Sequence, residues 1–353
     1  MQILVTGAAG LIGGEVVRRL ADAGHAVTAL VYRTHRIVAN DGQIVPSRTW
    51  DGVPPPGTVV TLCADVRIAD LGIAVDPRPD LIVHAAAITA FDAPRELYRT
   101  INIDGTANVI ALAERNGTPL LQVSTAYVCG TLDGWIGEAE RGTAFTNGYE
   151  ASKAAGEELI AAAAVRGLPT VIARPSIVVG DSRGGALREF GNIYTIFRLI
   201  AEGRLRKLPA AEGATLDLVP IDHVAGGIVA LAQAFDRARG RTVHLVAASA
   251  TPLAALGEAI ASMPGLGRPC FVPAATFDID ALVPAERRWH AAAASQYTGY
   301  LQRAPRFDTM NADRLVPRCP PTDAAWLRRL IAACVARGFV TARRDSVSPA
   351  IAA

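Results

Sequence analysis

The chain has 353 residues, half of them hydrophobic, and its 35 Lys plus Arg nearly balance its 33 Asp plus Glu to leave a formal charge of +2. This composition excludes a disordered acidic or basic tail protein and gives no electrostatic reason to expect a nucleic-acid partner. The length predicts about two domains, which is enough to bury a large core.

The sequence shows no pattern for membrane insertion or export. No apolar run reaches the roughly 18 uncharged residues that a membrane-spanning helix needs. The N-terminal sequence Met-Gln-Ile-Leu-Val-Thr-Gly has no basic flank, so it predicts a buried strand and not a signal peptide. The five cysteines are scattered without a CxxC pair, which favours neither a disulfide framework nor a zinc site. We therefore expect a cytoplasmic protein with no membrane partner and no metal.

Short β-branched runs alternate with helical patterns through the first half of the chain. The predicted strands are 3–6, 27–31, 59–63, 81–84, 120–124 and 171–173, and the predicted helices are 12–23, 94–116 and 149–166. Most of these strands are apolar throughout, as parallel strands covered on both faces must be. The order of strand, helix and strand predicts an α/β fold with a doubly wound parallel sheet.

The pattern loosens after about residue 180. A helix is predicted near 187–202, whereas 216–219, a helix after Asp222 and a strand at 243–246 are typical of a return to the sheet. We expect residues 1–180, joined by 215–250, to form the sheet domain. Residues 181–214 and 251–340 are expected to form a smaller, mostly helical substrate-binding cap, and 341–353 a disordered tail.

A glycine-rich turn follows the first predicted strand and opens the first predicted helix. Gly7 would make the tight turn, Gly10 would let backbone N–H groups approach a pyrophosphate, and Gly13 would let the helix pack closely on the strand. Leu11 and Ile12 lie between these glycines and would contact the same ligand. In this context the pattern predicts a dinucleotide-binding Rossmann domain, although a plain glycine-rich turn is the alternative.

The end of the second predicted strand indicates which dinucleotide binds. An acidic residue there would accept both ribose hydroxyls of NAD, but the chain has Tyr32 and Arg33, with Arg36 close behind. Guanidinium groups suit the 2′-phosphate, so we expect NADP(H) to be preferred over NAD(H). The alternative is that Arg33 is only a solvated loop residue.

The next two strands would complete the adenosine side of the site. Asp65 and Val66 follow the third strand and would hold the adenine amino group. Ala85, Ala86 and Ala87 follow the fourth strand and would pass under the adenosine ribose. His84, at the end of that strand, is predicted to be a core histidine.

Tyr149 and Lys153 lie one helical turn apart and therefore share a helix face. An ammonium beside a phenol favours the phenolate, so we expect Lys153 to lower the pKa of Tyr149 toward the working pH of a general acid or base. Lys153 and Lys207 are the two lysines of a chain that otherwise uses arginine. A compact ammonium fits this place better than a planar guanidinium. A surface Tyr–Lys pair is the alternative.

Hydroxyl groups follow the fifth predicted strand. Ser124 and Thr125 would lie at the ligand-facing end of the sheet, where a hydroxyl can hydrogen-bond a substrate carbonyl oxygen. We prefer Thr125 for this role. The alternative is that both hydroxyls only cap the strand end.

The chain resembles the extended short-chain dehydrogenases/reductases. The resemblance rests on the glycine turn, Ser124-Thr125-Ala126-Tyr127, Tyr149-Glu150-Ala151-Ser152-Lys153 and Arg174-Pro175. Within that superfamily the sequences at 147–150, 174–183 and 218–222 are similar to the thioester-reductase and fatty-acyl-reductase branch. The resemblance covers about residues 1–250 well and the cap only loosely.

The resemblance implies hydride transfer from NADPH to a carbonyl carbon. Tyr149 would protonate the developing oxyanion, Thr125 would hydrogen-bond it, and Lys153 would bind the nicotinamide ribose. Pro175 and Ile177 would also contact the cofactor.

Two departures from the superfamily pattern stand out. Tyr32 takes the place where many NADP-using relatives have an arginine, which leaves Arg33 to bind the phosphate. Cys129 and Val31 replace a tyrosine and an acid of the sugar epimerases, which argues against an NAD-dependent epimerase. Cys129 is predicted to be a small buried hydrophobe.

Several substrates remain open at this point. An acyl thioester, bound to CoA or to a carrier protein, would give an aldehyde, whereas an aldehyde or ketone would give an alcohol, as in hydroxysteroid- or flavonoid-type carbonyl reductases. A dinucleotide-sensing regulator would not need Tyr149 and Lys153 together. A monomer and a homodimer are both compatible with the sequence.

Two groups of cap residues are candidates for substrate contacts. A basic rim for a phosphopantetheine or CoA phosphate would consist of Arg183, Arg188, Arg198, Arg204 and Arg206, and a solvated basic face is its alternative. Trp289, Tyr297 and Tyr300 would form an apolar or aromatic substrate wall, and ordinary cap core is the alternative.

Overall fold

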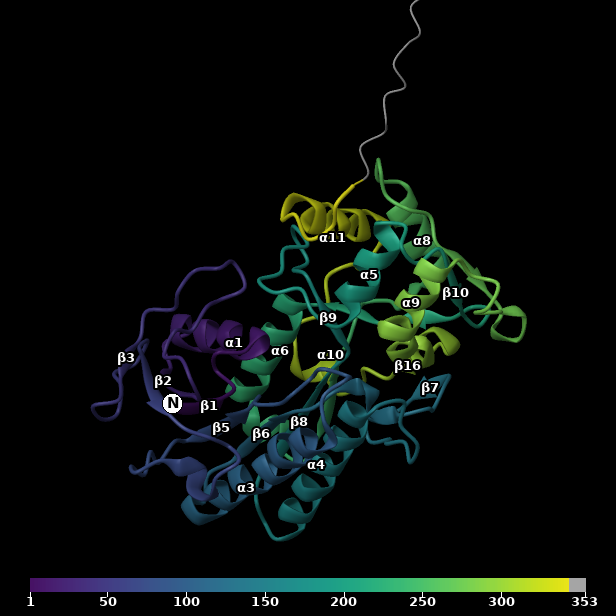
Figure 1. Ribbon diagram of the computed structural model, residues 1–353. Coiled ribbons are helices and arrows are strands. Elements are labelled where there is room, and N and C mark those ends of the chain that lie inside the picture. Colours follow the sequence, from purple (N-terminus) through teal and green to yellow (C-terminus); the bar gives the residue numbers. More distant parts are fainter. Residues whose placement is uncertain (343–353) are drawn as a thin grey trace, which may run out of the picture.

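An eight-stranded parallel sheet lies at the centre of residues 1–342, the part of the chain that the computed structural model describes (Figure 1). Its spatial order is β13 (Thr242–Leu245), β8 (Thr170–Pro175), β6 (Leu120–Val123), β5 (Leu81–His84), β1 (Gln2–Thr6), β2 (Ala26–Val31), β4 (Val59–Cys63) and β3 (Arg48–Thr49). From β1 the chain builds outward to β2 and β4 on one side, and from β5 to β6, β8 and β13 on the other. The strand order thus reverses between β1 and β5, and ligands of such sheets bind beyond the carboxyl ends of the strands at that point.

Helices cover both faces of this sheet because successive side chains of each strand point in opposite directions. Ile3 and Val5 belong to the core formed with α1 (Leu11–Asp22) and α6 (Ile221–Gln233), whereas Leu4 belongs to the core formed with α3 (Asp104–Asn116) and α4 (Gly148–Val165). Figure 1 shows these two helix pairs on opposite sides of the sheet. The predicted doubly wound α/β fold is confirmed.

The predicted helix at 94–116 contains an irregularity. It consists of α2 (Arg95–Leu97), a π-helical turn η2 (Tyr98–Ile103) and α3 in direct succession. Such π turns accommodate an extra residue in a helix and occur often near functional sites.

A second core lies beyond the carboxyl ends of the strands. Its main helices are α5 (Ile193–Ala201), α8 (Leu253–Ala261), α9 (Pro284–Ala292) and α11 (Ala324–Ala336). Trp326 is fully buried there, and its Nε1 donates a hydrogen bond to Asp181 O at 3.1 Å. Two-stranded pairings complete this region: β9 (Ile177–Val179) with β12 (Leu218–Pro220), β10 (Lys207–Pro209) with β15 (Cys270–Val272), β11 (Thr215–Leu216) with β14 (Thr251–Pro252), and β7 (Trp135–Ile136) with β16 (Arg306–Phe307).

The remaining elements are short. They are α7 (Phe235–Ala238), α10 (Ala312–Leu315) and the 3₁₀ turns η1 (Ala69–Gly72), η3 (Ala126–Cys129), η4 (Ala274–Thr276), η5 (Ala294–Gln296) and η6 (Thr298–Gln302). No helix between residues 1 and 342 is long and apolar enough to cross a membrane. The tail predicted at 341–353 falls, apart from its first two residues, outside the described part of the chain.

Candidate active site

The glycine turn after β1 leaves a space that a Cβ atom at the glycine positions would occupy. Gly7 has a φ of +67°, and a Cβ atom there would lie 2.6 Å from Ala86 N. A Cβ at Gly10 would lie 3.1 Å from Gly7 O, and Gly10 caps α1 with no side-chain hydrogen bond. The first turn of α1 therefore has no side-chain cap and lines a cavity, which fits the pyrophosphate of a dinucleotide.

His84 joins this turn to the neighbouring strand. Its Nδ1 lies 2.6 Å from Thr6 Oγ1, and its Nε2 lies 3.2 Å from Thr106 Oγ1. Burial lowers the pKa of His84 to about 3, so the ring is neutral at physiological pH. Its predicted role as a core histidine is confirmed.

Cationic side chains gather beside the end of β2. The guanidinium groups of Arg33 and Arg67 lie 5.0 and 4.9 Å from the ring centroid of Tyr32, which is half exposed. Arg67 also donates a hydrogen bond to the Tyr32 hydroxyl at 2.6 Å and forms an ion pair with Asp65 at 2.6 Å. The Asp65 carboxylate, expected to receive the adenine amino group, is thus already bound to an arginine, and the sequence had not singled out Arg67.

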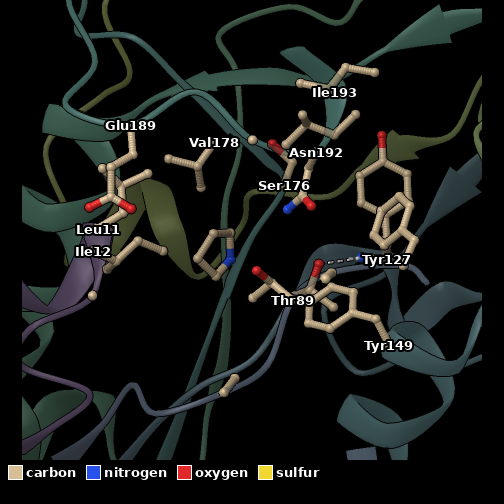
Figure 2. A pocket seen from close by; sticks show the side chains of 18 of the residues that line it. Leu11, Ile12, Thr89, Tyr127, Tyr149, Ser176, Val178, Glu189, Asn192 and Ile193 are labelled. Carbon is tan, nitrogen blue, oxygen red and sulfur yellow. Dashed lines mark hydrogen bonds between the residues drawn. The ribbon is translucent and has the colours of Figure 1, made fainter. Parts of the chain in front are cut away.

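A cavity of about 480 Å³ connects the glycine turn with the ends of β6 and β8 (Figure 2). The expected site residues that line it are Gly7, Gly10, Leu11, Ile12, Gly13, Ala85, Ala87, Ser124, Thr125, Tyr149, Pro175 and Ile177. The expected site residues outside its lining are Tyr32, Arg33, Arg36, Asp65, Val66, Ala86 and Lys153. The structure therefore brings the two ends of the predicted site into one cavity.

The start of α4 places Tyr149 at this cavity. Asn147 caps the helix by accepting a hydrogen bond from Glu150 N at 2.9 Å. Thr125 follows β6 and is hydrogen-bonded to Tyr149. Its hydroxyl oxygen accepts a hydrogen bond from Tyr127 N at 3.2 Å, which is the dashed line that ends at Tyr127 in Figure 2. The Thr125 hydroxyl keeps one hydrogen to donate, to Tyr149 or to a carbonyl oxygen bound in the cavity.

The structure contradicts the expectation that Lys153 lowers the pKa of Tyr149. Burial raises the pKa of Tyr149 to about 12, and a hydrogen bond with Thr125 offsets only part of this rise. Lys153 is buried, and its Nζ donates a hydrogen bond to Val123 O at 2.7 Å. Burial lowers the pKa of Lys153 itself to about 8. Tyr149 is therefore protonated at neutral pH, as a proton donor must be.

Ser124 lies beside these residues with its hydroxyl oxygen buried and without a protein hydrogen-bond partner. A buried polar atom left without a partner costs free energy unless a ligand or water binds it. The group is therefore a candidate ligand contact next to Thr125.

Several residues that line the cavity were not predicted from the sequence. Thr89 and Phe91 line the cavity from the segment after β5, and Asn192 lines it just before α5. The ring of Phe91 lies 6.1 Å from Tyr149 and 5.5 Å from Tyr300, centroid to centroid. These residues lie in loops without periodicity, so no sequence signal marked them.

The proposed aromatic wall is present only in part. Tyr297 and Tyr300 line the cavity, but Trp289 is not among its lining residues. The guanidinium of Arg204 lies 5.3 Å from the Trp289 ring centroid instead.

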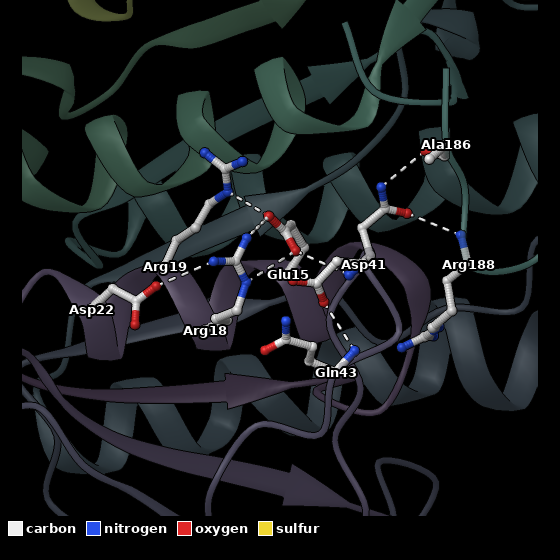
Figure 3. Close-up of polar contacts among 9 residues, drawn as sticks. Glu15, Arg18, Arg19, Asp22, Asp41, Gln43, Ala186 and Arg188 are labelled. Carbon is white, nitrogen blue, oxygen red and sulfur yellow. Dashed lines mark hydrogen bonds and ion pairs between the residues drawn. The ribbon is translucent and has the colours of Figure 1, made fainter. Parts of the chain in front are cut away.

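The proposed basic rim is not found at this cavity, because none of its five arginines lines it. Arg188 donates hydrogen bonds to Val38 O and Ala9 O, and its backbone N–H binds Asn40 Oδ1 at 3.0 Å. Asn40 Nδ2 also donates a hydrogen bond to Ala186 O at 3.0 Å, and Figure 3 shows dashed lines that end at Ala186 and Arg188. The segment 186–188 leads into the cavity wall. These hydrogen bonds hold it against the loop after β2.

A buried asparagine links the π turn to the cavity loop and to α4. Asn102 Oδ1 accepts a hydrogen bond from Ile88 N at 2.8 Å, and its Nδ2 donates to Ile88 O at 3.0 Å and to Ser152 Oγ at 2.8 Å. The segment that carries Thr89 and Phe91 is thus held against the helix that carries Tyr149.

Comparison with known proteins places this site in a family. A family profile described as male sterility protein matches residues 5–228. The glycine betaine reductase of Emericella nidulans is 26% identical over 65% of this chain, and a component of the linear gramicidin synthase of Brevibacillus parabrevis is 28% identical over 70% of it. The chain spans only 20% and 5% of the lengths of these two relatives.

A solved structure shows the same fold over nearly the whole chain. The terminal R domain from the myxalamid PKS-NRPS biosynthetic pathway has a TM-score of 0.78 and 23% identity, covering 97% of this chain and 92% of that domain. At this identity the likeness concerns the fold alone.

Proposed function

The chain belongs to the male sterility protein family and is an NAD(P)-dependent oxidoreductase of the extended short-chain dehydrogenase/reductase type, and from this premise we propose that it reduces acyl thioesters to aldehydes with NADPH. The observation that carries the proposal is the single cavity in which the glycine turn opens at one end and Thr125 and Tyr149 lie at the other. Such a cavity holds a dinucleotide and a carbonyl group side by side.

The residues at the carbonyl end perform proton chemistry. When bound, the reduced nicotinamide supplies the hydride. Thr125 donates a hydrogen bond to the carbonyl oxygen, and Tyr149, protonated because of its raised pKa, transfers a proton to that oxygen as charge develops on it. Lys153 is buried in the same helix, one turn after Tyr149, and binds the nicotinamide ribose. Ser124 provides a second hydroxyl at the same edge of the sheet.

The thioester part of the proposal rests on the relatives. Linear gramicidin synthase is 28% identical over 70% of this chain, and the sequences at 147–150, 174–183 and 218–222 resemble the thioester-reductase branch. Thr125 and Tyr149 act on the carbonyl oxygen and do not distinguish a thiol leaving group from hydrogen or carbon. We therefore propose that the substrate arrives as an ester of CoA or of a carrier protein, and that a hemithioacetal collapses to aldehyde and thiol.

The preference for NADPH is proposed from the cations beside β2. Arg33 and Arg67 flank Tyr32, and Arg36 follows in the same exposed loop, where a 2′-phosphate would approach. The ratio of kcat/KM for NADPH over NADH tests this assignment, and a preference for NADH would reject it.

The reaction itself is tested by following NADPH oxidation with acyl-CoAs, acyl-pantetheines, aldehydes and ketones. We expect thioester-dependent oxidation with release of a free thiol, and its loss in Tyr149→Phe. Turnover of ketones or aldehydes alone would identify a carbonyl reductase instead. Cofactor binding without turnover, unchanged in Tyr149→Phe, would identify a dinucleotide sensor.

A further inference from the structure

A serine in the cavity wall has its hydroxyl hydrogen bound to a buried carboxylate. Ser176 lies between the end of β8 and the start of β9 and lines the cavity, with Pro175 and Ile177 on either side. In the view of Figure 2 it lies on the opposite side of the cavity from Tyr149. Its Oγ donates a hydrogen bond to Asp217 Oδ1 at 2.5 Å.

Asp217 is held rigidly behind this wall. It is 5% exposed, and its Oδ1 also accepts a hydrogen bond from Ala247 N at 2.8 Å. Its backbone O accepts a hydrogen bond from Ile177 N at 3.1 Å, and the following strand β12 pairs with β9. Burial raises the pKa of Asp217 to about 6, so the group is ionised at pH 7.5.

The direction of this hydrogen bond decides what Ser176 can offer to a ligand. An ionised carboxylate only accepts hydrogen bonds, so the one hydroxyl hydrogen of Ser176 is committed to Asp217. The remaining capacity of Ser176 Oγ is its lone pairs. Ser176 is therefore an acceptor, whereas Thr125 and Tyr149 are the donors of the same cavity.

We propose that Ser176 accepts a hydrogen bond from the carboxamide NH₂ of the nicotinamide ring, and that Asp217 is the positioning residue that holds Ser176 in this orientation. The proposal rests on the proposed function, which places the hydride-donating carbon of the ring beside the carbonyl held by Thr125 and Tyr149. The carboxamide is attached to the adjacent ring carbon, so it lies close to that place. Its amide hydrogens need an acceptor, and Ser176 supplies one between Pro175 and Ile177, which are expected to contact the cofactor.

The test compares two cofactors that differ in the amide alone. The 3-acetylpyridine analogue of NADP⁺ keeps the carbonyl group and replaces NH₂ by CH₃. Titration calorimetry without substrate is expected to show that the intact protein binds NADP⁺ about three- to tenfold more tightly than the analogue, as one hydrogen bond predicts. In Ser176→Ala, binding of NADP⁺ weakens by that factor and binding of the analogue does not change, so the preference disappears.

The chain offers a matched control in a second serine–aspartate pair. Ser182 Oγ donates a hydrogen bond to Asp222 Oδ2 at 2.6 Å, and Ser182 is not among the residues that line the cavity. Ser182→Ala is expected to leave both dissociation constants unchanged. Asp217→Asn, where it folds, is expected to reduce the preference as Ser176→Ala does. Ser176→Thr keeps the hydroxyl and should retain the preference.

The outcomes are distinct. The proposal is overturned if Ser176→Ala keeps the preference for NADP⁺ over the analogue, or if it loses affinity for both cofactors equally. In either case the serine would support the cavity wall without a hydrogen bond to the amide. A chain that favours NAD⁺ is tested with NAD⁺ and its 3-acetylpyridine analogue. Because no substrate is present, failure to reduce thioesters rejects the proposed function and leaves this binding result standing.

Discussion

The buried ammonium of Lys153 should make the fold less stable while it serves the chemistry. The pKa of Lys153 falls from 10.5 to about 8 because burial removes water from the charge. At neutral pH this fall corresponds to about 3 kcal/mol of unfavourable free energy in the folded state. Replacement by Met, which is apolar and similarly long, removes this cost and also removes the hydrogen bond to Val123 O, worth about 1 kcal/mol. We therefore expect Lys153→Met to raise the free energy of unfolding by about 2 kcal/mol and to abolish turnover.

The sign of the effect can be checked with pH. Because the folded-state pKa of Lys153 is lowered, the unfolded chain holds the proton more tightly, and the penalty is fully present below pH 8. It disappears as the pH rises from about 8 to 10.5, so the difference between the wild type and Lys153→Met should shrink over this range. Urea unfolding followed by tryptophan fluorescence at pH 7 and pH 10 measures both values.

The other lysine provides the control. Lys207 is exposed, so Lys207→Met should change the free energy of unfolding by less than about 0.5 kcal/mol and leave turnover intact. A Lys153→Met protein that is less stable than the wild type at pH 7, with a deficit independent of pH, would refute this reasoning. Lys153→Arg keeps the charge but should still lose most activity, because a planar guanidinium does not fit the space of an ammonium.

Further predictions concern the proton donor, the cofactor and the buried core. Tyr149→Phe should lower kcat by about 10²- to 10⁴-fold in steady-state assays and change the Kd of NADPH less than twofold; retained kcat would exclude it as the acid. The kcat/KM should fall above pH 8 as free-enzyme Lys153 loses its proton, and a flat profile to pH 10 would contradict the role of its charge. Arg33→Ala should reduce the ratio of kcat/KM for NADPH over NADH at least tenfold, whereas an unchanged ratio would make Arg33 a solvated loop residue. Glu157→Gln breaks a buried ion pair with Arg174 at 2.7 Å and should cost about 3–5 kcal/mol in urea unfolding, an effect absent if water enters the site.

Local patterns in the sequence predicted every strand of the central sheet except β3. The prediction that 216–219 returns to this sheet is wrong, because β11 and β12 pair with β14 and β9 instead. The β-branched runs at 59–63 and 81–84 coincide with β4 and β5, because strands buried on both faces need continuous apolar sequence. The glycine turn and the spacing of Tyr149 and Lys153 could also be identified from the sequence, since each depends on a few neighbouring residues. The π turn at η2 was not predicted, and neither were the hydrogen bonds of its Asn102 with the distant Ile88 and Ser152.

The electrostatic state of the site was misjudged for the same reason. The spacing of Tyr149 and Lys153 suggested a lowered phenol pKa, but burial by distant segments raises it to about 12. Desolvation and ion pairing sum over everything that surrounds a group, and a sequence motif contains only its own part of those surroundings.

The sequence by itself determined the doubly wound fold, the dinucleotide turn and the Tyr149–Lys153 pair, because periodicity, glycine conformation and helical spacing are properties of short stretches of chain. Only the tertiary structure decided that Phe91 stacks near Tyr149, that the Ser176 hydroxyl is bound to Asp217, and that Arg188 is bound to Ala9 O. These contacts join residues that lie 41 or more positions apart, and no local preference of the chain specifies which distant partner folding brings to each of them.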